Sequence, residues 1–312
     1  MTLPDADGLS PKTETCPEVA IVVLNWNNYE DTAECLKSLE DIEYPKFSVW
    51  VVDNNSTDGS EERLSKEFGW CRFIFNNAND GFAAGNNIGI KQALSTEAEY
   101  VLLLNNDTVV PPSFLTKLVR TGESFDDIGI IGPTILDYED GDVLDSGRTF
   151  NRYTMALKNP YEGKRLDEIE GQRNSHIVIG CCMLIKREVI DDVGLLDDLH
   201  FFFGGEDVDY CIRARKAGWE IVVRQDTHIC HKVDATSRSI SPPRKYHTTR
   251  NKIHLYKLHV GEMSVFSIIF RAMIDFLTAT RYIYRGHWRM VRSIYLGYVD
   301  AIRGRSENNR FG

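Results

Sequence analysis

The sequence lacks the cysteine patterns that hold small secreted or zinc-binding proteins together. Its seven cysteines are an odd number, and no two of them form a CxxC pair. A chain of 312 residues can bury a large apolar core without help from disulfides or metals. We therefore predict small buried thiols in a reducing compartment, and neither a zinc ribbon nor a disulfide framework.

Long apolar runs are also missing. The most apolar window, from Met263 to Ala279, is interrupted by Arg271 and Asp275, so no membrane-spanning helix is predicted. Residues 1–17 are polar and contain proline, and they lack the basic and apolar regions of a secretory signal. We expect this segment to be mobile and the protein to be cytoplasmic.

Positive charge is scarce over most of the chain. The 36 Lys and Arg residues are outnumbered by 46 Asp and Glu residues, which gives a net charge of -10 and a pI near 5.4. This balance argues against nucleic-acid binding. Residues 250–312 are the exception, with 11 basic against 4 acidic side chains. We expect the acidic body and the basic tail to have different roles.

Strand and helix patterns alternate through the first hundred residues. Apolar, β-branched runs predict buried strands, and segments with helical spacing of apolar residues separate them. The predicted strands are 19–25, 47–53, 71–75 and 100–105, and the predicted helices are 29–39, a helix opening at Asp58, and 85–94. Asp58 and Glu61 form a candidate capping box. This order predicts an α/β fold with a mostly parallel sheet flanked by helices.

The pattern becomes looser after residue 107. The predicted elements are a helix over 114–125, a short strand in IGIIGP, a strand running into a helix within 176–194, a helix over 208–216 and a strand in EIVVR. Residues 137–175 are charged and rich in turn formers. We expect a hairpin or a mobile loop beside a site in this segment.

Two carboxylates follow strands of the predicted sheet. Asp53 ends the second strand and Asp107 follows the fourth, and ligands bind at this edge of open α/β sheets. Each residue alone is also compatible with a helix cap or an Asx turn. Together they indicate a site. A Rossmann dinucleotide site is not predicted, because the first strand leads into LNWNNYED, which contains no glycine.

Seven segments in a fixed order resemble those of a known enzyme family. They are VVLNWNN, VVDNNSTDGS, NDGFAAGNNIGI, LLLNNDT, GCCMLIKREVIDDVGLLD, FFFGGEDVDYCIRARKAG and HKVDATS, and they fall within residues 19–255. The chain resembles the inverting family 2 glycosyltransferases of GT-A fold, and within them the rhamnosyltransferase-like branch. The resemblance implies a GT-A domain over 18–255. A helical, amphipathic and basic region is expected to follow over 256–312.

The resemblance also implies a site for a divalent cation. A nucleotide-sugar donor has a diphosphate leaving group, whose charge Mg²⁺ or Mn²⁺ neutralises. Asn105, Asn106 and Asp107 look like a degenerate DXD motif on the nucleotide-sugar side, in which Asp107 alone keeps the metal-binding carboxylate. His231 matches the family's late histidine and would complete the metal shell, with His228 as the rival position.

An inverting transfer needs a base that takes the proton of the acceptor hydroxyl. By resemblance Asp207 is that base, while Glu206 and Asp209 touch the acceptor or organise the helix start. A cluster of acids at a helix N-terminus has a simpler role as well, because it complements the helix dipole. The aromatic residues Phe201 to Phe203 would raise the carboxylate pKa toward a useful value.

The remaining site residues are assigned to the donor. By resemblance Asp53 holds the nucleotide base or ribose, and Asn25 lines the same pocket. Gly81 and Asn86 lie in the segment that resembles the donor-side loop. Arg250 matches a recurring Arg-Asn pair, and it either binds a phosphate or is a solvated arginine at the start of a helix.

The tail has an amphipathic pattern. Polar residues recur every three or four positions from Ser264 to Arg292, which places them on one helical stripe surrounded by apolar residues. Such helices either lie on a membrane surface, through residues 262–305, or dock on the body or on a second subunit of a homo-oligomer.

These observations lead to one functional hypothesis with two alternatives. The chain is expected to move a sugar, with inversion, from a nucleotide-diphosphate sugar to a glycan or lipid-linked acceptor at the cytoplasmic face of the cell membrane. The first alternative is a polyprenyl-phosphate sugar synthase, and the second is a non-catalytic module that binds nucleotides or carbohydrates. A glycosidase fits less well, because acids at strand ends suit nucleotide and metal binding better than leaving-group protonation.

Overall fold

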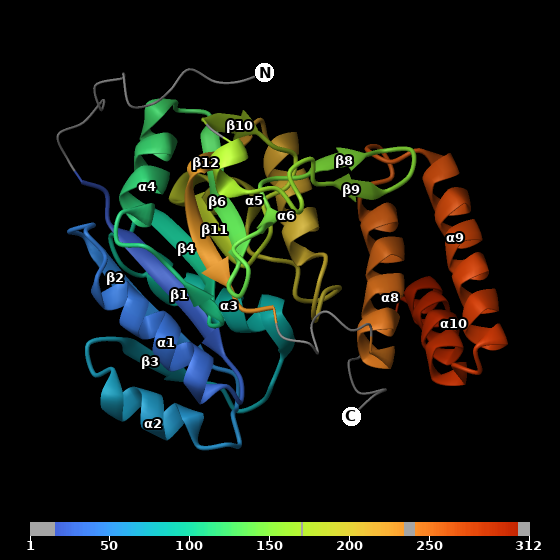
Figure 1. The fold of residues 1–312 in the computed structure, drawn as a ribbon, viewed down its shortest axis with the longest axis horizontal. Helices are drawn as coiled ribbons and strands as arrows, with labels where there is room; N and C mark the ends of the chain where they lie inside the picture. Colours follow the sequence, from blue (N-terminus) through green and yellow to red (C-terminus); the bar gives the residue numbers. More distant parts are fainter. Residues whose placement is uncertain (1–15, 170, 234–240, 305–312) are drawn as a thin grey trace.

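The computed structural model describes residues 16–169, 171–233 and 241–304. The predicted mobile segment at 1–17 therefore falls almost entirely outside the described residues. Within them, a ten-stranded mixed sheet with helices on both faces forms the body, and three C-terminal helices stand beside it (Figure 1). The structure confirms the predicted α/β class with a helical C-terminal region.

The first half of the sheet follows the predicted alternation. Its strands run parallel in the order β4-β1-β2-β3. They are β1 (Val19–Asn25), β2 (Phe47–Asp53), β3 (Arg72–Phe75) and β4 (Tyr100–Asn105). Because β1, β2 and β4 are buried on both faces, their sequences are continuously apolar rather than alternating.

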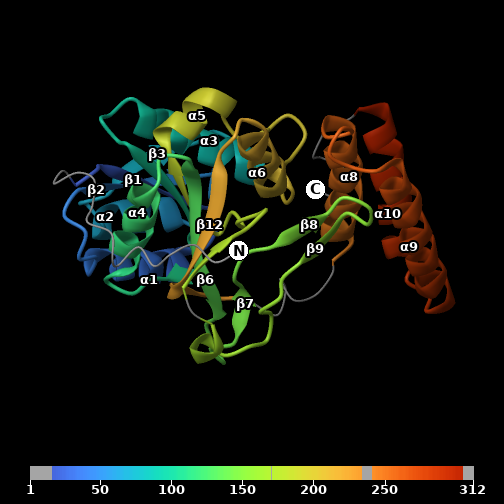
Figure 2. The same ribbon diagram turned by 90° about the horizontal axis from the view of Figure 1, so that it is seen from above.

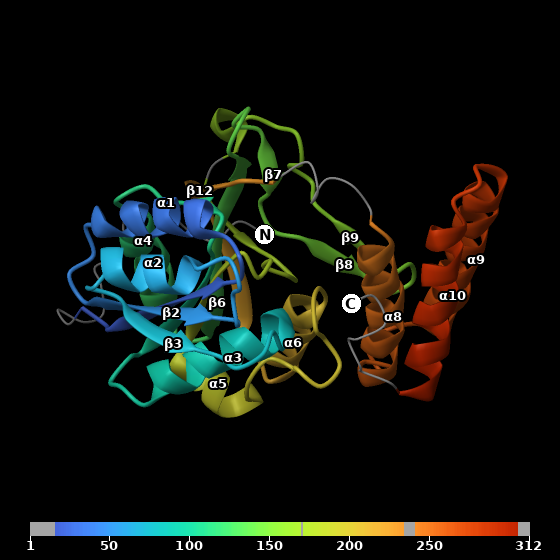
Figure 3. The same ribbon diagram turned by 90° about the horizontal axis from the view of Figure 1, so that it is seen from below.

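Helices cover the two faces of the sheet in separate groups (Figure 3). On one face, a single apolar cluster joins the sheet to α1 (Tyr29–Glu40), α2 (Ser60–Glu67) and α4 (Phe114–Ser124). The cluster on the other face includes α3 (Gly81–Leu94), α5 (Arg187–Val193) and α6 (Glu206–Lys216). Five of the seven cysteines, all of them free, are buried in these two layers.

The predicted helix N-cap at Asp58 is one residue too early. The helix α2 begins at Ser60, and its N-cap is Gly59, whose φ of +77° is left-handed. Asp58 Oδ1 accepts a hydrogen bond from Ser60 N at 3.0 Å, in the turn before the helix. Glycine adopts this backbone conformation without steric cost, so the chain turns at Gly59 instead of at the acid.

The second half of the sheet contains longer strands than predicted. Here β11 (Cys182–Lys186) runs antiparallel between β4 and β6 (Ile128–Asp137), and β12 (Glu220–His231) lies parallel beyond β6. The predicted short strand ended at Pro133, yet β6 continues past it. Proline lacks the N–H that a ladder needs, and the register of β12 shifts between Arg224 and His228, directly opposite.

The charged segment 137–175 forms several short strands. A hairpin of β8 (Thr149–Asn151) and β9 (Ala156–Lys158) projects toward the C-terminal helices (Figure 2), so the predicted hairpin is present. The other strands here, together with a short one after β4, add to the main sheet. They are β5 (Thr108–Val109), β7 (Val143–Asp145) and β10 (Gln172–Asn174).

The C-terminal region consists of α8 (Pro242–Leu258), α9 (Val265–Tyr284) and α10 (Trp288–Arg303). Figures 1 to 3 show α8 nearest the body and α9 farthest from the sheet. Residue 255, the predicted domain boundary, lies inside α8. Among the helices of the described ranges, none combines the length and the apolar character that crossing a membrane requires.

Candidate active site

The carboxyl ends of the parallel strands bring the predicted donor residues together. The register places Asn25 beside Asp53, and it places Leu24 of β1 beside Asn105 at the end of β4. The predicted residues of three strands therefore share one edge of the sheet, which is where ligands bind in this architecture.

Asp53 and Asn25 are buried at this edge of the sheet. Asn25 Nδ2 donates to Asp53 Oδ2 at 2.7 Å, and Asp53 also accepts from the backbone N and the hydroxyl of Ser56. Thr32 donates to Asn25 Oδ1 at 2.9 Å and accepts from Asn106 Nδ2 at 2.7 Å. This chain of hydrogen bonds connects the ends of β1, β2 and β4 and holds their side chains in one orientation.

Gly81 lies where two distant segments touch. Its φ is +91°, and a Cβ at this position would come within 2.4 Å of the Phe202 carbonyl oxygen. Asn54, at the end of β2, donates to the Gly81 carbonyl at 3.1 Å, and Phe82 N donates to the Phe202 carbonyl at 2.8 Å. The donor-side loop is therefore fastened both to β2 and to the aromatic segment before α6.

The two neighbouring asparagines of α3 make different contacts. Asn86 is buried and donates to the Phe82 carbonyl at 2.9 Å, within its own helix. Asn87, which the sequence did not single out, both donates to the Leu196 carbonyl and accepts from Leu196 N, and it also donates to Asp198. It ties α3 to the chain that leads into α6. In the sequence, Asn87 is only a second amide beside Asn86 in a predicted helix, which is a weak signal of such a contact.

Asp107 and His231 converge at the sheet edge. Asp107 Oδ1 and His231 Nε2 lie 3.1 Å apart, and both atoms are buried. Neither atom has a hydrogen-bond partner among the described residues. Two lone-pair atoms that face each other without a hydrogen bond fit a shared cation, for which oxygen and imidazole nitrogen are suitable ligands. No cluster of three or more such ligands occurs in the described ranges, so a diphosphate and water would supply the rest.

The position of His231 is set by its neighbour. Lys232 N donates to the Asp107 carbonyl at 2.9 Å, and Lys232 Nζ pairs with Asp31 at 2.7 Å and with Glu34, both on α1. The rival histidine, His228, pairs with β6 three residues earlier on β12. Since side chains alternate along a strand, His228 and His231 point to opposite faces. The geometry therefore favours His231 as the partner of Asp107.

Asp207 lies at the first turn of α6, close to the end of β4. Its Oδ1 accepts from Val208 N at 2.8 Å and its Oδ2 from Gly180 N at 3.2 Å. The next residue, Cys181, accepts from Asn105 N at 2.9 Å. Two consecutive residues thus connect Asp207 to the end of β4. Burial raises the pKa of Asp207 against the opposing effect of these hydrogen bonds.

Glu206 is more deeply buried than its neighbour. Its side chain is 6% exposed, and Oε2 has no hydrogen-bond partner among the described residues. Burial, and next the nearby charge of Asp207, raise its pKa to about 8. Glu206 is therefore largely protonated at neutral pH, so its carboxyl group can donate a hydrogen bond beside Asp207.

The sequence did not single out Arg148 and Asp145, which lie near Asp207. Arg148 Nε donates to Asp145 Oδ2, and the Arg148 charge lowers the Asp207 pKa while that of Asp145 raises it. Both residues come from the turn-rich segment 137–175. The only sequence signal was an arginine three residues after an aspartate in a loop already expected to lie beside a site.

The two remaining predicted residues support the loop and helix around Asp207. Asp209 is buried and pairs with Arg213 at 2.8 Å and with His259 at 2.8 Å, so it connects α6 to the end of α8. Arg250 is fully buried, which makes the solvated-arginine alternative wrong, and its Nη2 donates to the His200 carbonyl at 3.3 Å. Both side chains are used for packing between α8 and the segment that carries Asp207.

Comparisons with known proteins agree with this geometry. The family model described as glycosyl transferase family 2 matches residues 20–194, more than half of the chain. The hexosyltransferase Agl10 of low-salt glycan biosynthesis, from Haloferax volcanii, is 27% identical over 91% of this chain and 87% of its own length. The dTDP-rhamnosyl transferase RfbF of Shigella flexneri is 25% identical, with 84% and 88% covered. The O-antigen biosynthesis protein RfbC of Myxococcus xanthus is 29% identical over 73% of this chain, but the match spans only 18% of RfbC.

A solved structure shows the same fold. The mannosyltransferase PcManGT of Pyrobaculum calidifontis, determined with GDP-mannose and Mn²⁺, superposes with a TM-score of 0.59 at 15% identity. The superposition covers 96% of this chain and 90% of that protein, so it includes the C-terminal helices. With the family model, the relatives and the strand-edge geometry in agreement, this chain belongs to glycosyl transferase family 2 and is a glycosyltransferase of GT-A fold.

Proposed function

We propose that this enzyme transfers a sugar, with inversion, from a nucleotide-diphosphate sugar to a glycan or lipid-linked acceptor. The observation that supports this most strongly is the pair of buried atoms on Asp107 and His231, which lie 3.1 Å apart without a hydrogen bond. They lie beside the end of β4, which Cys181 and Gly180 connect to Asp207. One edge of the sheet thus offers ligands for a cation and a carboxylate base. Asn25 and Asp53 would bind the nucleoside part of the donor at the same edge.

The proposed reaction has a balanced course. Asp207 takes the proton of the acceptor hydroxyl, and the oxygen attacks the anomeric carbon from the face opposite the diphosphate. The bond between the anomeric carbon and the phosphate oxygen breaks, and its electron pair leaves with the nucleoside diphosphate. When bound, Mg²⁺ or Mn²⁺ neutralises the charge on that leaving group. Asp107 and His231 would hold the cation.

The neighbourhood of Asp207 suits a base. Burial raises its pKa, and a base with a raised pKa accepts a proton more strongly once it is ionised. The backbone N–H groups of Gly180 and Val208 hold the carboxylate in place. Glu206, largely protonated, is positioned to donate a hydrogen bond toward the acceptor without adding a second negative charge.

The acceptor class is supported by the relatives, whose names refer to O-antigen and low-salt glycan biosynthesis. We propose a saccharide acceptor for a cell-surface glycan, carried on a lipid. The seven free cysteines suit a reducing compartment, and we propose that the enzyme works on the cytoplasmic side of a membrane.

The test begins with the donor. Thermal unfolding is measured with a panel of nucleoside diphosphates and their sugars, with and without Mn²⁺ or Mg²⁺, because a ligand of the folded state raises the melting temperature. We expect one nucleotide to act only when metal is present, and Asp107→Ala to abolish that shift. Asp41→Ala is the matched control, since Asp41 is exposed at the far end of α1. A metal-dependent shift that survives in Asp107→Ala would contradict the proposed site.

The reaction itself is tested with the nucleotide sugar so identified. Lipid-linked saccharides, soluble oligosaccharides and polyprenyl phosphate are offered separately, and the anomeric configuration of the product is read by nuclear magnetic resonance. We expect transfer to a saccharide with inversion. Transfer to polyprenyl phosphate alone would identify a polyprenyl-phosphate sugar synthase instead, and retention of configuration would exclude Asp207 as the proposed base.

A further inference from the structure

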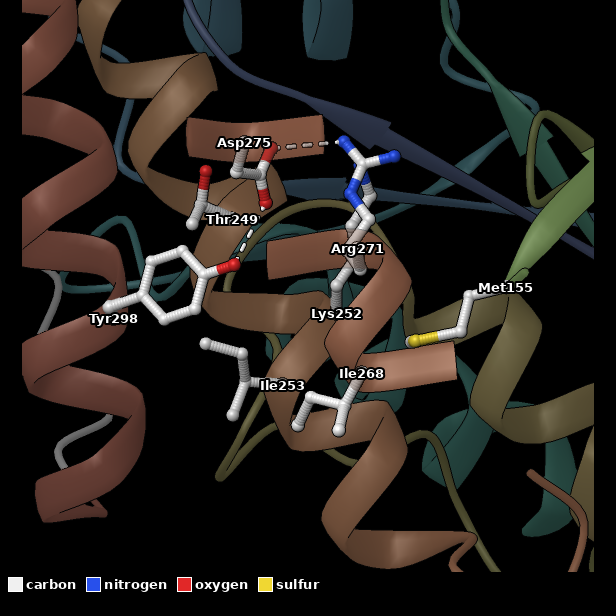
Figure 4. Close-up of a pocket in the computed structure, with 8 residues that line it drawn as sticks. All are labelled: Met155, Thr249, Lys252, Ile253, Ile268, Arg271, Asp275 and Tyr298. Carbon is white, nitrogen blue, oxygen red and sulfur yellow. Dashed lines mark hydrogen bonds and ion pairs between the residues drawn. The ribbon is translucent and has the colours of Figure 1, made fainter. Parts of the chain in front are cut away.

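The helix α9 has its polar side turned toward the protein. Ser267 and Asp275 are buried, and Asp275 lies 3.2 Å from Arg271 Nη2, 3.4 Å from Lys245 Nζ of α8 and 3.1 Å from the Tyr298 hydroxyl of α10. Figure 4 shows the contacts of Asp275 with Arg271 and Tyr298 beside a small cavity between the helices. The charged side chains of α9 up to residue 280, Arg271 and Asp275, thus form contacts within the three-helix region.

The opposite side of α9 is apolar and exposed. Its side chains recur at positions i, i+3, i+4 and i+7, which is one face of a helix. Eight of them, each between 38% and 69% exposed, are Val265, Phe266, Ile269, Phe270, Met273, Phe276, Leu277 and Ile283. No charged side chain interrupts this face between residues 265 and 280. We call these eight residues the α9 face. At 20 residues, α9 extends about 30 Å.

This arrangement corrects one expectation. Docking on the body would have left the polar stripe of the tail facing solvent. Instead the part of the stripe on α9, including Ser267, Arg271 and Asp275, faces inward. The stripe also ends at Gly286 and His287, where the chain turns into α10.

Basic and aromatic residues border the α9 face at one end. Arg281 and Arg285 are exposed at the end of α9, and Arg289 and Arg292 are exposed at the start of α10. Two large aromatic residues, Tyr284 and Trp288, are 93% and 63% exposed beside them. Arginines and aromatic rings next to a broad apolar helix face are typical of helices that lie in the interface of a membrane.

We propose that the α9 face inserts into the surface of a membrane that contains anionic lipids. The exposed arginines would bind lipid phosphates, whereas the acidic body would be repelled by such a membrane. The charge distribution therefore orients the molecule with α9 toward the lipid. This inference does not depend on the proposed donor site, because it rests on α9 and α10 alone.

A second copy of this chain is the competing occupant. Protein interfaces surround their apolar core with polar groups that form hydrogen bonds across the contact. The α9 face has almost none, since Thr280 is the only polar side chain within its exposed arc before Arg281. Lipid chains require no such groups, so the membrane fits this surface better.

The C-terminal helices are joined through α8 to the segment that leads into α6. Asn251 of α8 donates to the Phe203 carbonyl at 3.0 Å, and Arg250 donates to the His200 carbonyl. Both acceptors belong to the segment that leads into α6 and Asp207.

The experiment is sedimentation of the full chain with vesicles. We expect binding to vesicles of phosphatidylcholine mixed with phosphatidylglycerol, and weaker binding to phosphatidylcholine alone. Ile269→Glu combined with Phe276→Glu should weaken binding by roughly tenfold or more, because two charges would enter the apolar layer. Trp70→Glu is the control, since Trp70 is 42% exposed at the opposite edge of the sheet. Circular dichroism confirms that each variant is folded.

The arginines are tested separately. Arg281→Gln with Arg285→Gln should weaken binding to anionic vesicles by about fivefold per arginine and leave binding to neutral vesicles nearly unchanged. Light scattering of the wild type in solution addresses the competing occupant. A dimer that Ile269→Glu with Phe276→Glu converts to a monomer, together with no vesicle binding by the wild type, would overturn the proposal in favour of a second copy. Equal vesicle binding by the wild type and that double variant would also overturn it.

Discussion

The two adjacent carboxyl groups at the start of α6 differ in accessibility and therefore in chemistry. Asp207 is half-buried and hydrogen-bonded to two backbone N–H groups, whereas Glu206 is almost fully buried and has one orphaned oxygen. Burial raises both pKa values, and the charge of one opposes ionisation of the other. Neighbouring acids with different environments can divide the roles of base and hydrogen-bond donor.

Replacement of the proposed base should remove turnover without removing the fold. Asp207→Asn keeps the shape of the side chain and one of the two oxygens that accept backbone N–H groups, but it cannot accept the acceptor's proton. We expect kcat to fall roughly 10²- to 10⁴-fold, with the donor-induced thermal shift unchanged. The wild-type rate should rise with pH through the raised pKa of Asp207, and this dependence should be absent in Asp207→Asn. A variant that keeps more than half of the wild-type rate would rule out this role.

Glu206 should make the stability of the protein depend on pH. Its pKa is about 8 in the folded state and near 4.5 when unfolded, so between these values the folded state holds the extra proton. The free energy of unfolding then falls as pH rises through this window. The side chain in Glu206→Gln cannot ionise. We therefore expect the free energy of unfolding of this variant to exceed that of the wild type by about 1 kcal/mol or more at pH 8 but not at pH 5. Urea denaturation at pH 5 and pH 8 measures the free energy of unfolding of both proteins. The same difference between variant and wild type at both pH values would refute the predicted role of Glu206.

Single contacts decide how the elements around the site are joined. Gly81 allows α3 to start against the carbonyl of Phe202, Asn87 fastens α3 to Leu196, and Arg250 reaches from α8 to His200. All three contacts hold the segment between α5 and α6. This segment carries no regular structure of its own between residues 194 and 205, so its position depends on them.

A methyl group at Gly81 should disturb this junction. Gly81→Ala combines a left-handed φ with a contact of 2.4 Å to the Phe202 carbonyl oxygen, and we expect a loss of about 3 kcal/mol in unfolding free energy. Gly141→Ala is the matched control, because Gly141 has a φ of +73° with open space around it. It should lose only about 1 kcal/mol. Chemical denaturation compares the two variants, and similar losses would show that the Phe202 contact is unimportant.

At the scale of the whole molecule, the C-terminal helices form a three-helix unit attached to the body through α8. The inward charges of α9 meet Lys245 and Tyr298, and Ser264 N donates to the Arg152 carbonyl of the β8–β9 hairpin at 3.0 Å. The unit is therefore in contact with both the hairpin and the segment before α6. Its orientation toward a membrane would be transmitted to the active site.

Removal of the buried acid in α9 should loosen this unit. In Asp275→Ala the charges of Lys245 and Arg271 lose their shared partner, and we expect α9 to lose about 3 kcal/mol of stability. Hydrogen exchange should become faster in α9 and α10 but not in β1 or β4. The control Glu62→Ala removes an exposed pair with Lys66 and should cost less than about 1 kcal/mol. Unchanged exchange in α9 would refute the structural role of Asp275.

The meeting of polar residues at one edge of the sheet could be predicted from the sequence because it depends on strand ends. Continuous apolar runs identify parallel strands, and the polar residues that follow them must meet at one edge. Asp53 and Asp107 were predicted in this way, and the family resemblance added Asn25, Asp207 and His231. The pairing of Asp107 with His231 over His228 required the register of β12, since it depends on which face of a strand each side chain occupies.

The sequence by itself determined the α/β class, the succession of the first four strands along the chain and the family. Local periodicity encodes the strands, and motif order encodes the family. Only the tertiary structure decided which groups near Asp207 interact. Arg148, Asp145 and Asn87 lie in segments without strong periodicity, and their roles arise from contacts between residues far apart in the chain. The orientation of α9 has the same origin. An amphipathic sequence specifies two faces, but the partners Lys245 and Tyr298 select which one is buried.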